Sequence, residues 1–189
     1  PILSQPNTFG SFRKGVNQGK DAFLESVYEQ LLHDNIIDAH TTLTMWKDFI
    51  LLDLRDPKLH IENIDGGMFL QCFCSDNVEN TDTYTFSQFI KGKSVKDDVS
   101  KMSTKDRNLL LRDYKHESAV MNFEKYIHES NGAEEILIPI LQSCWSLSKS
   151  HTFPNKQKGS LEIVVFEEIN EKIKLSKYGY VPTSERSYY

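Results

Sequence analysis

Two cysteines separated by one residue, Cys72 and Cys74 in the stretch QCFCSDN, are the first residues whose types could do chemistry. A structural zinc site needs four Cys or His ligands, commonly with about two to four residues between paired cysteines, and a thiol–disulfide redox site uses Cys-x-x-Cys. The third cysteine, Cys144, is distant in the chain, so neither pattern is present. The alternation of GGMFLQCFC favours a buried strand over residues 68–74. We therefore expect core cysteines, with no bound metal and no cofactor.

A second motif, GVNQGKD at residues 15–21, looks at first like a phosphate-binding loop. It is one residue shorter than the Walker pattern G-x-x-x-x-G-K-[ST], and Asp21 stands where the pattern needs a hydroxyl for magnesium. Basic residues before a helix would still favour an anion, because the backbone N–H groups of a helix N-terminus attract negative charge. Arg13, Lys14 and Lys20 are therefore candidate anion-binding residues.

Scattered carboxylates offer a route to catalysis. Asp65 and Glu162, with Lys174, would form a nuclease-like site if the fold brought these strand residues together around a metal ion. No H-E-x-x-H, G-x-S-x-G or other complete catalytic motif accompanies them. Solvated charged faces explain these residues more simply, so the sequence argues against an enzyme without deciding the question.

Aromatic residues gather near the C-terminus in YGYVPTSERSYY. Tyrosine suits protein contacts, because each ring buries a large area at a small cost in conformational entropy. Tyr178, Tyr180 and Arg186 are therefore candidate contact residues. Stacking on single-stranded RNA is the alternative use, which would normally come with several interleaved arginines.

The elements that must position these residues are mainly helical. In KDAFLESVYEQLLHDN, two rows of apolar residues with a spacing of four form one stripe of a helix: Phe23, Val27 and Leu31, and Leu24, Tyr28 and Leu32. A second helix is expected to begin at Asp38 as its N-cap and to end before Pro57. It would bury Leu43, Trp46, Phe49 and Ile50.

Three more helices and a hairpin complete the prediction. Capping-box spacing at Ser94 and Ser103 predicts helices over 94–102 and 103–130. EEILIPILQSCWS predicts another helix, in which Pro139 would be tolerated only in the first turn. LEIVVFEE and KIKLSKYGYV, with a bend at residues 169–170, predict a C-terminal β-hairpin.

The predicted fold class is α+β, a predominantly helical domain with a small antiparallel sheet that includes the C-terminal β-hairpin. Residues 1–20 are expected to form an extended or mobile arm, 21–181 a single α+β domain, and 182–189 a C-terminal tail. This length and the 39% hydrophobic content are enough for a substantial core.

Net charge and cysteine content restrict the setting. The net charge of −5 argues against a surface built wholly for nucleic acid. Three cysteines and the absence of an N-x-[ST] sequon favour an intracellular protein, cytoplasmic or nuclear. No run approaches the ~20 apolar residues that span a bilayer, so no membrane association is expected.

We therefore predict a soluble, non-catalytic interaction domain or adaptor that binds another protein, or a second copy of itself. The contact would use an exposed helix face or the tyrosine-bearing hairpin. The alternatives are a phosphate-substrate or nucleic-acid-processing enzyme that uses the scattered carboxylates, and an RNA-binding module.

Overall fold

The computed structural model describes residues 21–74, 86–93, 101–129, 134–169 and 172–178 of the 189-residue chain. For residues 134–135, 164–169 and 172–178 it describes the backbone only. The predicted arm (1–20), the tail (182–189) and most of the predicted helix over 94–102 lie outside these ranges. Those predictions remain untested.

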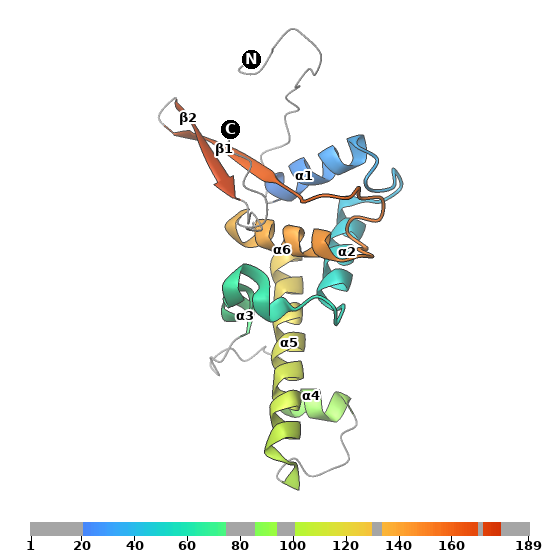
Figure 1. The fold of residues 1–189 in the computed structure, drawn as a ribbon, viewed down its shortest axis with the longest axis vertical. Helices are drawn as coiled ribbons and strands as arrows, with labels where there is room; N and C mark the ends of the chain where they lie inside the picture. The colour runs from blue at the N-terminus through green and yellow to red at the C-terminus, as the bar shows by residue number, and fades with distance from the viewer. Residues whose placement is uncertain (1–20, 75–85, 94–100, 130–133, 170–171, 179–189) are drawn as a thin grey trace.

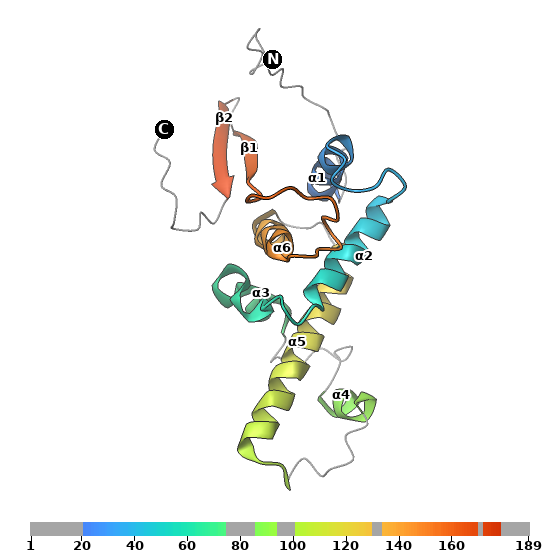
Figure 2. The ribbon, with the colours of Figure 1, turned by 45° about the vertical axis from the view of Figure 1, so that its right-hand side comes forward.

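A long helix, α5 (Thr104–Glu129), forms the spine of the protein (Figure 1). Its C-terminal half packs in the helical body, whereas α4 (Phe86–Gly92) lies beside its N-terminal half, away from the other helices (Figure 2). The remaining helical elements form the body: α1 (Ala22–His33), α2 (Leu43–Leu54), the 3₁₀ segment η1 (Ile61–Gly67), α3 (Met68–Phe73) and α6 (Glu134–Ser146). Among the described residues, no helix combines the length and apolar character needed to cross a bilayer.

The apolar stripe predicted for the first helix is confirmed. Leu24 and Leu31 of α1 are buried, and the other members of the two rows pack against the same core. Trp46 and Ile50 of α2 contribute fully buried side chains opposite them. Burial of each large apolar side chain stabilises the fold by about 1.5–3 kcal/mol, so packing on this core fixes α1 and α2.

The strand predicted over residues 68–74 is wrong, because this segment forms the helix α3. Phe69 and Phe73 are four residues apart, so both point at Phe123 of α5, with ring centroids 5.6 and 5.1 Å away. The helical turn leaves Cys72 exposed and Cys74 half-buried. The expectation of core cysteines in a strand is therefore wrong for the strand and for Cys72, whereas Cys74 packs against the core.

The predicted α+β class is wrong as well, because the packed body is helical. Every fully buried core residue that the structure describes lies in a helix or in a connecting segment. Strands β1 (Ile163–Ile169) and β2 (Lys172–Tyr178) pair antiparallel, with Phe166 opposite Leu175. This ribbon has two strands and no third neighbour within the described residues, so it does not form the sheet layer of an α+β domain.

The predicted N-terminus of the second helix is corrected. Thr42, and not Asp38, is the N-cap of α2, and its hydroxyl accepts a 3.2 Å hydrogen bond from the Met45 N–H. Asp38 instead accepts a 2.8 Å hydrogen bond from the His40 N–H in the preceding turn.

Pro139 was expected in the first turn of its helix, but it lies inside α6 beyond that turn. Its missing N–H removes one intrahelical hydrogen bond. The Ser103 cap of α5 is confirmed, since its hydroxyl accepts from the Asp106 N–H at 3.2 Å.

Candidate interaction surface

Helix α2 exposes apolar side chains on the face opposite the core. Met45, Phe49 and Leu52 are spaced i, i+4 and i+7, which places them in one row along two turns. Met45 and Leu52 are 43% and 46% exposed, and Phe49 is half-buried. We call these three residues the α2 row. The same helix therefore presents apolar side chains both to the core and to solvent.

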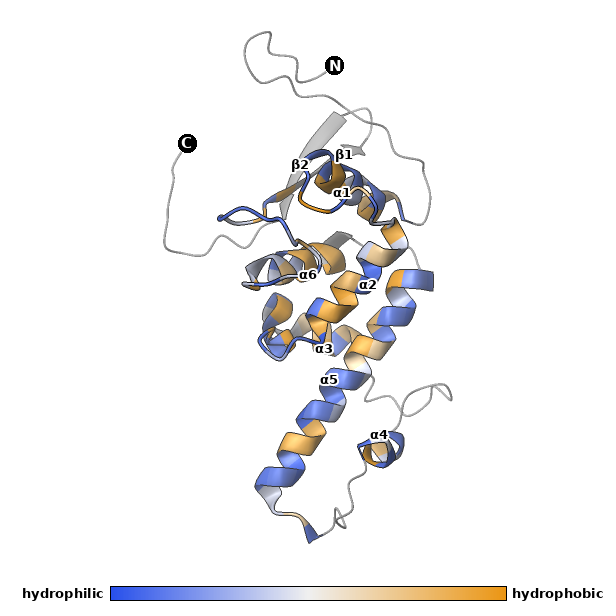
Figure 3. Cartoon of the chain, turned by 90° about the vertical axis from the view of Figure 1, so that its right-hand side faces the viewer, coloured by the Kyte–Doolittle hydropathy of each residue, from blue (hydrophilic) through white to orange (hydrophobic). Residues whose placement is uncertain are grey.

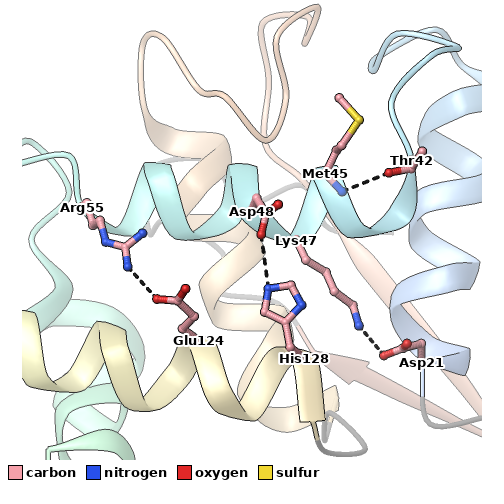
Figure 4. Close-up of polar contacts among 8 residues, drawn as sticks. All are labelled: Asp21, Thr42, Met45, Lys47, Asp48, Arg55, Glu124 and His128. Carbon is pink, nitrogen blue, oxygen red and sulfur yellow. Dashed lines mark hydrogen bonds and ion pairs between the residues drawn. The ribbon is translucent and has the colours of Figure 1, made fainter. Parts of the chain in front are cut away.

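A buried charge pair fixes the beginning of α2. The Lys47 Nζ lies 2.6 Å from the Asp21 Oδ1, and the Lys47 side chain is only 5% exposed (Figure 4). On the core side, the Trp46 Nε1 donates a 3.0 Å hydrogen bond to the Thr152 carbonyl. These contacts hold the helix against α1 and against the segment that follows α6, so the α2 row stands on a rigid support.

A buried carboxylate holds one flank of α2. Asp53 has no exposed surface, and its two oxygens accept hydrogen bonds from the Ser150 hydroxyl at 2.5 Å, the His151 N–H at 2.7 Å and the Thr152 N–H at 3.0 Å. Hydrogen bonds to an ionised acceptor are stronger than neutral ones, and three of them offset the cost of burying the charge. Asp53 thereby fastens residues 150–152 alongside the helix.

Helices α2 and α5 lie side by side (Figure 3), and two ion pairs join them (Figure 4). The Arg55 Nη2 lies 2.8 Å from the Glu124 Oε2, and the His128 Nε2 lies 3.2 Å from the Asp48 Oδ1. The side chains of both pairs are between 31% and 57% exposed, so each pair contributes at most about 1 kcal/mol and mainly orients the two helices. A further fixed contact is the 3.0 Å hydrogen bond that the His116 Nε2 donates to the Leu54 carbonyl.

Met121 is an exposed apolar side chain of α5. It is 38% exposed and lies one turn before Glu124. We call the α2 row, Met121 and the two ion pairs together the α2 surface. It combines exposed apolar side chains with paired charges of both signs, a composition that suits contact with another protein.

None of the predicted site residues is among those that define the α2 surface. Tyr178 ends β2, where its backbone lies opposite Ile163, and nothing is described of its side chain. The other five candidates fall outside the described residues: Arg13, Lys14, Lys20, Tyr180 and Arg186. Their proposed roles therefore remain predictions.

The carboxylate set is corrected in one respect. Asp65 was expected in a strand, but it lies in η1 with φ +49° and an exposed side chain. Glu162 is also exposed and lies just before β1, and Lys174 lies in β2. Within the described ranges, no three His, Cys, Asp or Glu side chains converge on a site that could hold a metal ion.

Sequence reasoning missed the α2 row, although its signal was present. The interpretation of the second helix counted Trp46, Phe49 and Ile50 as one buried face. Met45 and Leu52 show that apolar residues continue around the helix, which is typical of a helix that is buried on all sides or binds a partner. Comparison of the chain with protein-family models, curated proteins and solved structures found no match.

Proposed function

We propose that this chain is a non-catalytic interaction domain that binds another protein, and that the α2 surface receives an amphipathic helix of that partner. The observation that carries the proposal is the exposure of Met45 and Leu52, 43% and 46%, on a helix whose opposite face is fully buried. The partner would cover apolar area that the domain itself leaves in water.

The form of the surface favours a helix as the occupant. The α2 row is a single file about 10 Å long (~1.5 Å of rise per residue). Rows of this kind form the ridges of a helix surface, and the ridges of a second helix pack between them. The surface is also unsuited to nucleic acid, because Asp48 and Glu124 would face the phosphates.

The size of the surface indicates its place within an interface. A standard interface uses about 20–30 residues on each side, and a few central residues supply most of the affinity. Met45, Phe49, Leu52 and Met121 would form such a centre, and the Arg55–Glu124 and Asp48–His128 pairs would lie at its rim. We therefore expect reversible binding in which truncation of a row residue weakens affinity tenfold or more.

Site-specific photo-crosslinking tests the proposal. Leu52 is replaced by benzoylphenylalanine, and the protein is irradiated in lysate of its source cells. The matched control carries the same group at Asn63, which is also exposed but lies in η1. We expect a discrete protein adduct from position 52 that is absent from position 63.

Competition decides whether the adduct reports the α2 surface. Unlabelled wild-type protein should abolish the adduct, whereas the double variant Met45→Asp/Leu52→Asp should compete at least tenfold less well. Both positions are exposed, so this variant should keep its helical circular dichroism. Equal competition by the two proteins, or no adduct, would overturn the proposal. An adduct of twice the chain mass would identify a second copy as the occupant.

A further inference from the structure

A cavity of about 540 Å³, widely open to solvent, lies at the end of α6 and in the segment that follows. Its walls come from residues 145–150, 153–154 and 156–159. The volume falls within the ~300–1,000 Å³ that is usual for small-molecule sites. The α2 surface takes no part in these walls, so a ligand in this cavity would be independent of the proposed protein partner.

The charge of the cavity wall has one sign. Lys149, Lys156 and Lys158 line it, together with serine hydroxyls, and neither Asp nor Glu does. This is notable in a chain whose net charge is −5. Lys149 and Lys158 are exposed, and no carboxylate among the described residues pairs with either. Their charge is therefore available to a ligand.

Lys156 is fixed within the wall. Its Nζ donates hydrogen bonds to the carbonyls of Trp145 and Leu147 at the end of α6. An ammonium group has three protons, so one remains to be donated to a ligand. Burial lowers the pKa of Lys156 below its ordinary value. A bound anion would favour the charged amine and offset this effect.

The aromatic side of the cavity is equally well fixed. The Trp145 Nε1 donates a 2.8 Å hydrogen bond to the Gly159 carbonyl, and its ring packs edge-on against Phe153 at 5.0 Å. Asp53 anchors the intervening residues 150–152 from behind. The cavity is therefore preformed, which lowers the entropic cost of binding.

We propose that this cavity binds a phosphate-bearing anion, with Lys149, Lys156 and Lys158 as its cationic partners and Trp145 as its apolar wall. The charge of Asp53 already acts on Lys156, so a ligand with a single carboxylate would balance only one of the two remaining ammonium groups, those of Lys149 and Lys158. A phosphate ester or a pyrophosphate carries about two or more negative charges and several acceptor oxygens. The apolar wall would favour an organic phosphate over the inorganic ion.

The two tryptophans allow a direct test by ¹H–¹⁵N correlation spectroscopy of the full chain. One indole signal belongs to Trp145 in the cavity wall and the other to Trp46, which is fully buried in the core. The protein is titrated with pyrophosphate and with ADP at constant ionic strength. We expect a saturable shift of the Trp145 signal that is larger than any shift of the Trp46 signal.

A pair of variants with the same change in charge tests the lysines. Lys149→Gln/Lys158→Gln should weaken binding about fivefold or more, whereas Lys58→Gln/Lys125→Gln, at exposed positions outside the cavity, should change it less than twofold. Tighter binding of ADP than of pyrophosphate would identify the ligand as an organic phosphate, and the reverse order would identify an inorganic one. The proposal is overturned if neither titration saturates, or if both double variants weaken binding equally.

Discussion

The Ser150 hydroxyl donates a 2.5 Å hydrogen bond to the carboxylate of Asp53, a residue 97 positions earlier in the chain. Both residues are buried, and the same carboxylate also accepts from the backbone N–H groups of His151 and Thr152. One side chain of α2 therefore determines the path of the segment after α6. That segment in turn forms the lysine-lined cavity, and its residues 150–152 lie alongside α2, outside the α2 surface.

Replacement of Asp53 by Asn should strongly destabilise the protein. The amide keeps the shape of the side chain but offers one accepting oxygen, so at least one buried donor loses its partner. We expect the free energy of unfolding to fall by about 2–3 kcal/mol. Urea denaturation followed by circular dichroism measures it. Asp113→Asn, at an exposed position of α5, is the control and should change the free energy of unfolding by less than about 0.5 kcal/mol. An Asp53→Asn variant as stable as this control would contradict the prediction.

The Asp21–Lys47 pair should respond differently to the loss of each partner. Asp21→Asn leaves the Lys47 ammonium buried without a counter-charge, and we expect a loss of about 1–3 kcal/mol in the free energy of unfolding. Lys47→Met removes the buried charge and keeps the apolar stem, so its effect should be near neutral. The comparison is made by urea denaturation of both variants. If Lys47→Met costs as much as Asp21→Asn, the pair stabilises the fold by direct attraction, and this account fails.

The helices with one clear periodicity could be predicted from the sequence. In α1 the rows Phe23–Val27–Leu31 and Leu24–Tyr28–Leu32 lie next to each other only in a helix, because a strand would place them on opposite faces. The structure confirms the helix. The segment 68–74 fits two periods, because Phe69 and Phe73 share a face both in a strand and in a helix. Packing of both rings on Phe123 stabilises the helix over the strand. That contact joins residues about 50 positions apart in sequence.

The α2 surface and the lysine-lined cavity were less predictable, because both depend on contacts between residues far apart in the sequence. The Asp53 anchor depends on donors at Ser150, His151 and Thr152 that no local pattern connects with it. The lysine-lined cavity arises only when this anchor folds residues 145–159 back on themselves. In contrast, the spacing of Met45, Phe49 and Leu52 was visible in the sequence. The sequence did not show which side of α2 the core covers, because that side is determined by contacts with distant segments.

The buried thiol of Cys144 should make stability depend on pH in the alkaline range. Burial raises the pKa of this thiol far above its ordinary value, with a further contribution from Asp53. The unfolded state therefore loses the proton first, and stability falls as the pH rises above about 8.5. Between pH 8 and 9.5 we expect a loss of about 1 kcal/mol in the wild type that Cys144→Ala does not show. Urea midpoints of both proteins across this interval measure the difference, and parallel pH profiles would refute the prediction.

The aromatic cluster of α4 should contribute to the local stability of α4 and little to the stability of the whole domain. Phe89 is fully buried, and its ring packs against Phe86 at 6.2 Å and Tyr114 at 5.7 Å, apart from the main core. A buried Phe→Ala change in a main core costs about 3–5 kcal/mol. Because α4 lies beside the N-terminal half of α5, it can detach without unfolding the helical body. We therefore expect Phe89→Ala to accelerate amide hydrogen exchange in α4 while global stability changes by less than about 1 kcal/mol.

Phe123→Ala is the matched control for Phe89→Ala, because Phe123 is equally buried but lies in the main core. It should lower the global free energy of unfolding by about 3–5 kcal/mol. Hydrogen exchange read by mass spectrometry, together with urea denaturation, separates the two cases. Equal losses of global stability would mean that α4 and the helical body unfold as one unit. In that event the N-terminal half of α5 would unfold together with its C-terminal half, and the prediction of local unfolding would be wrong.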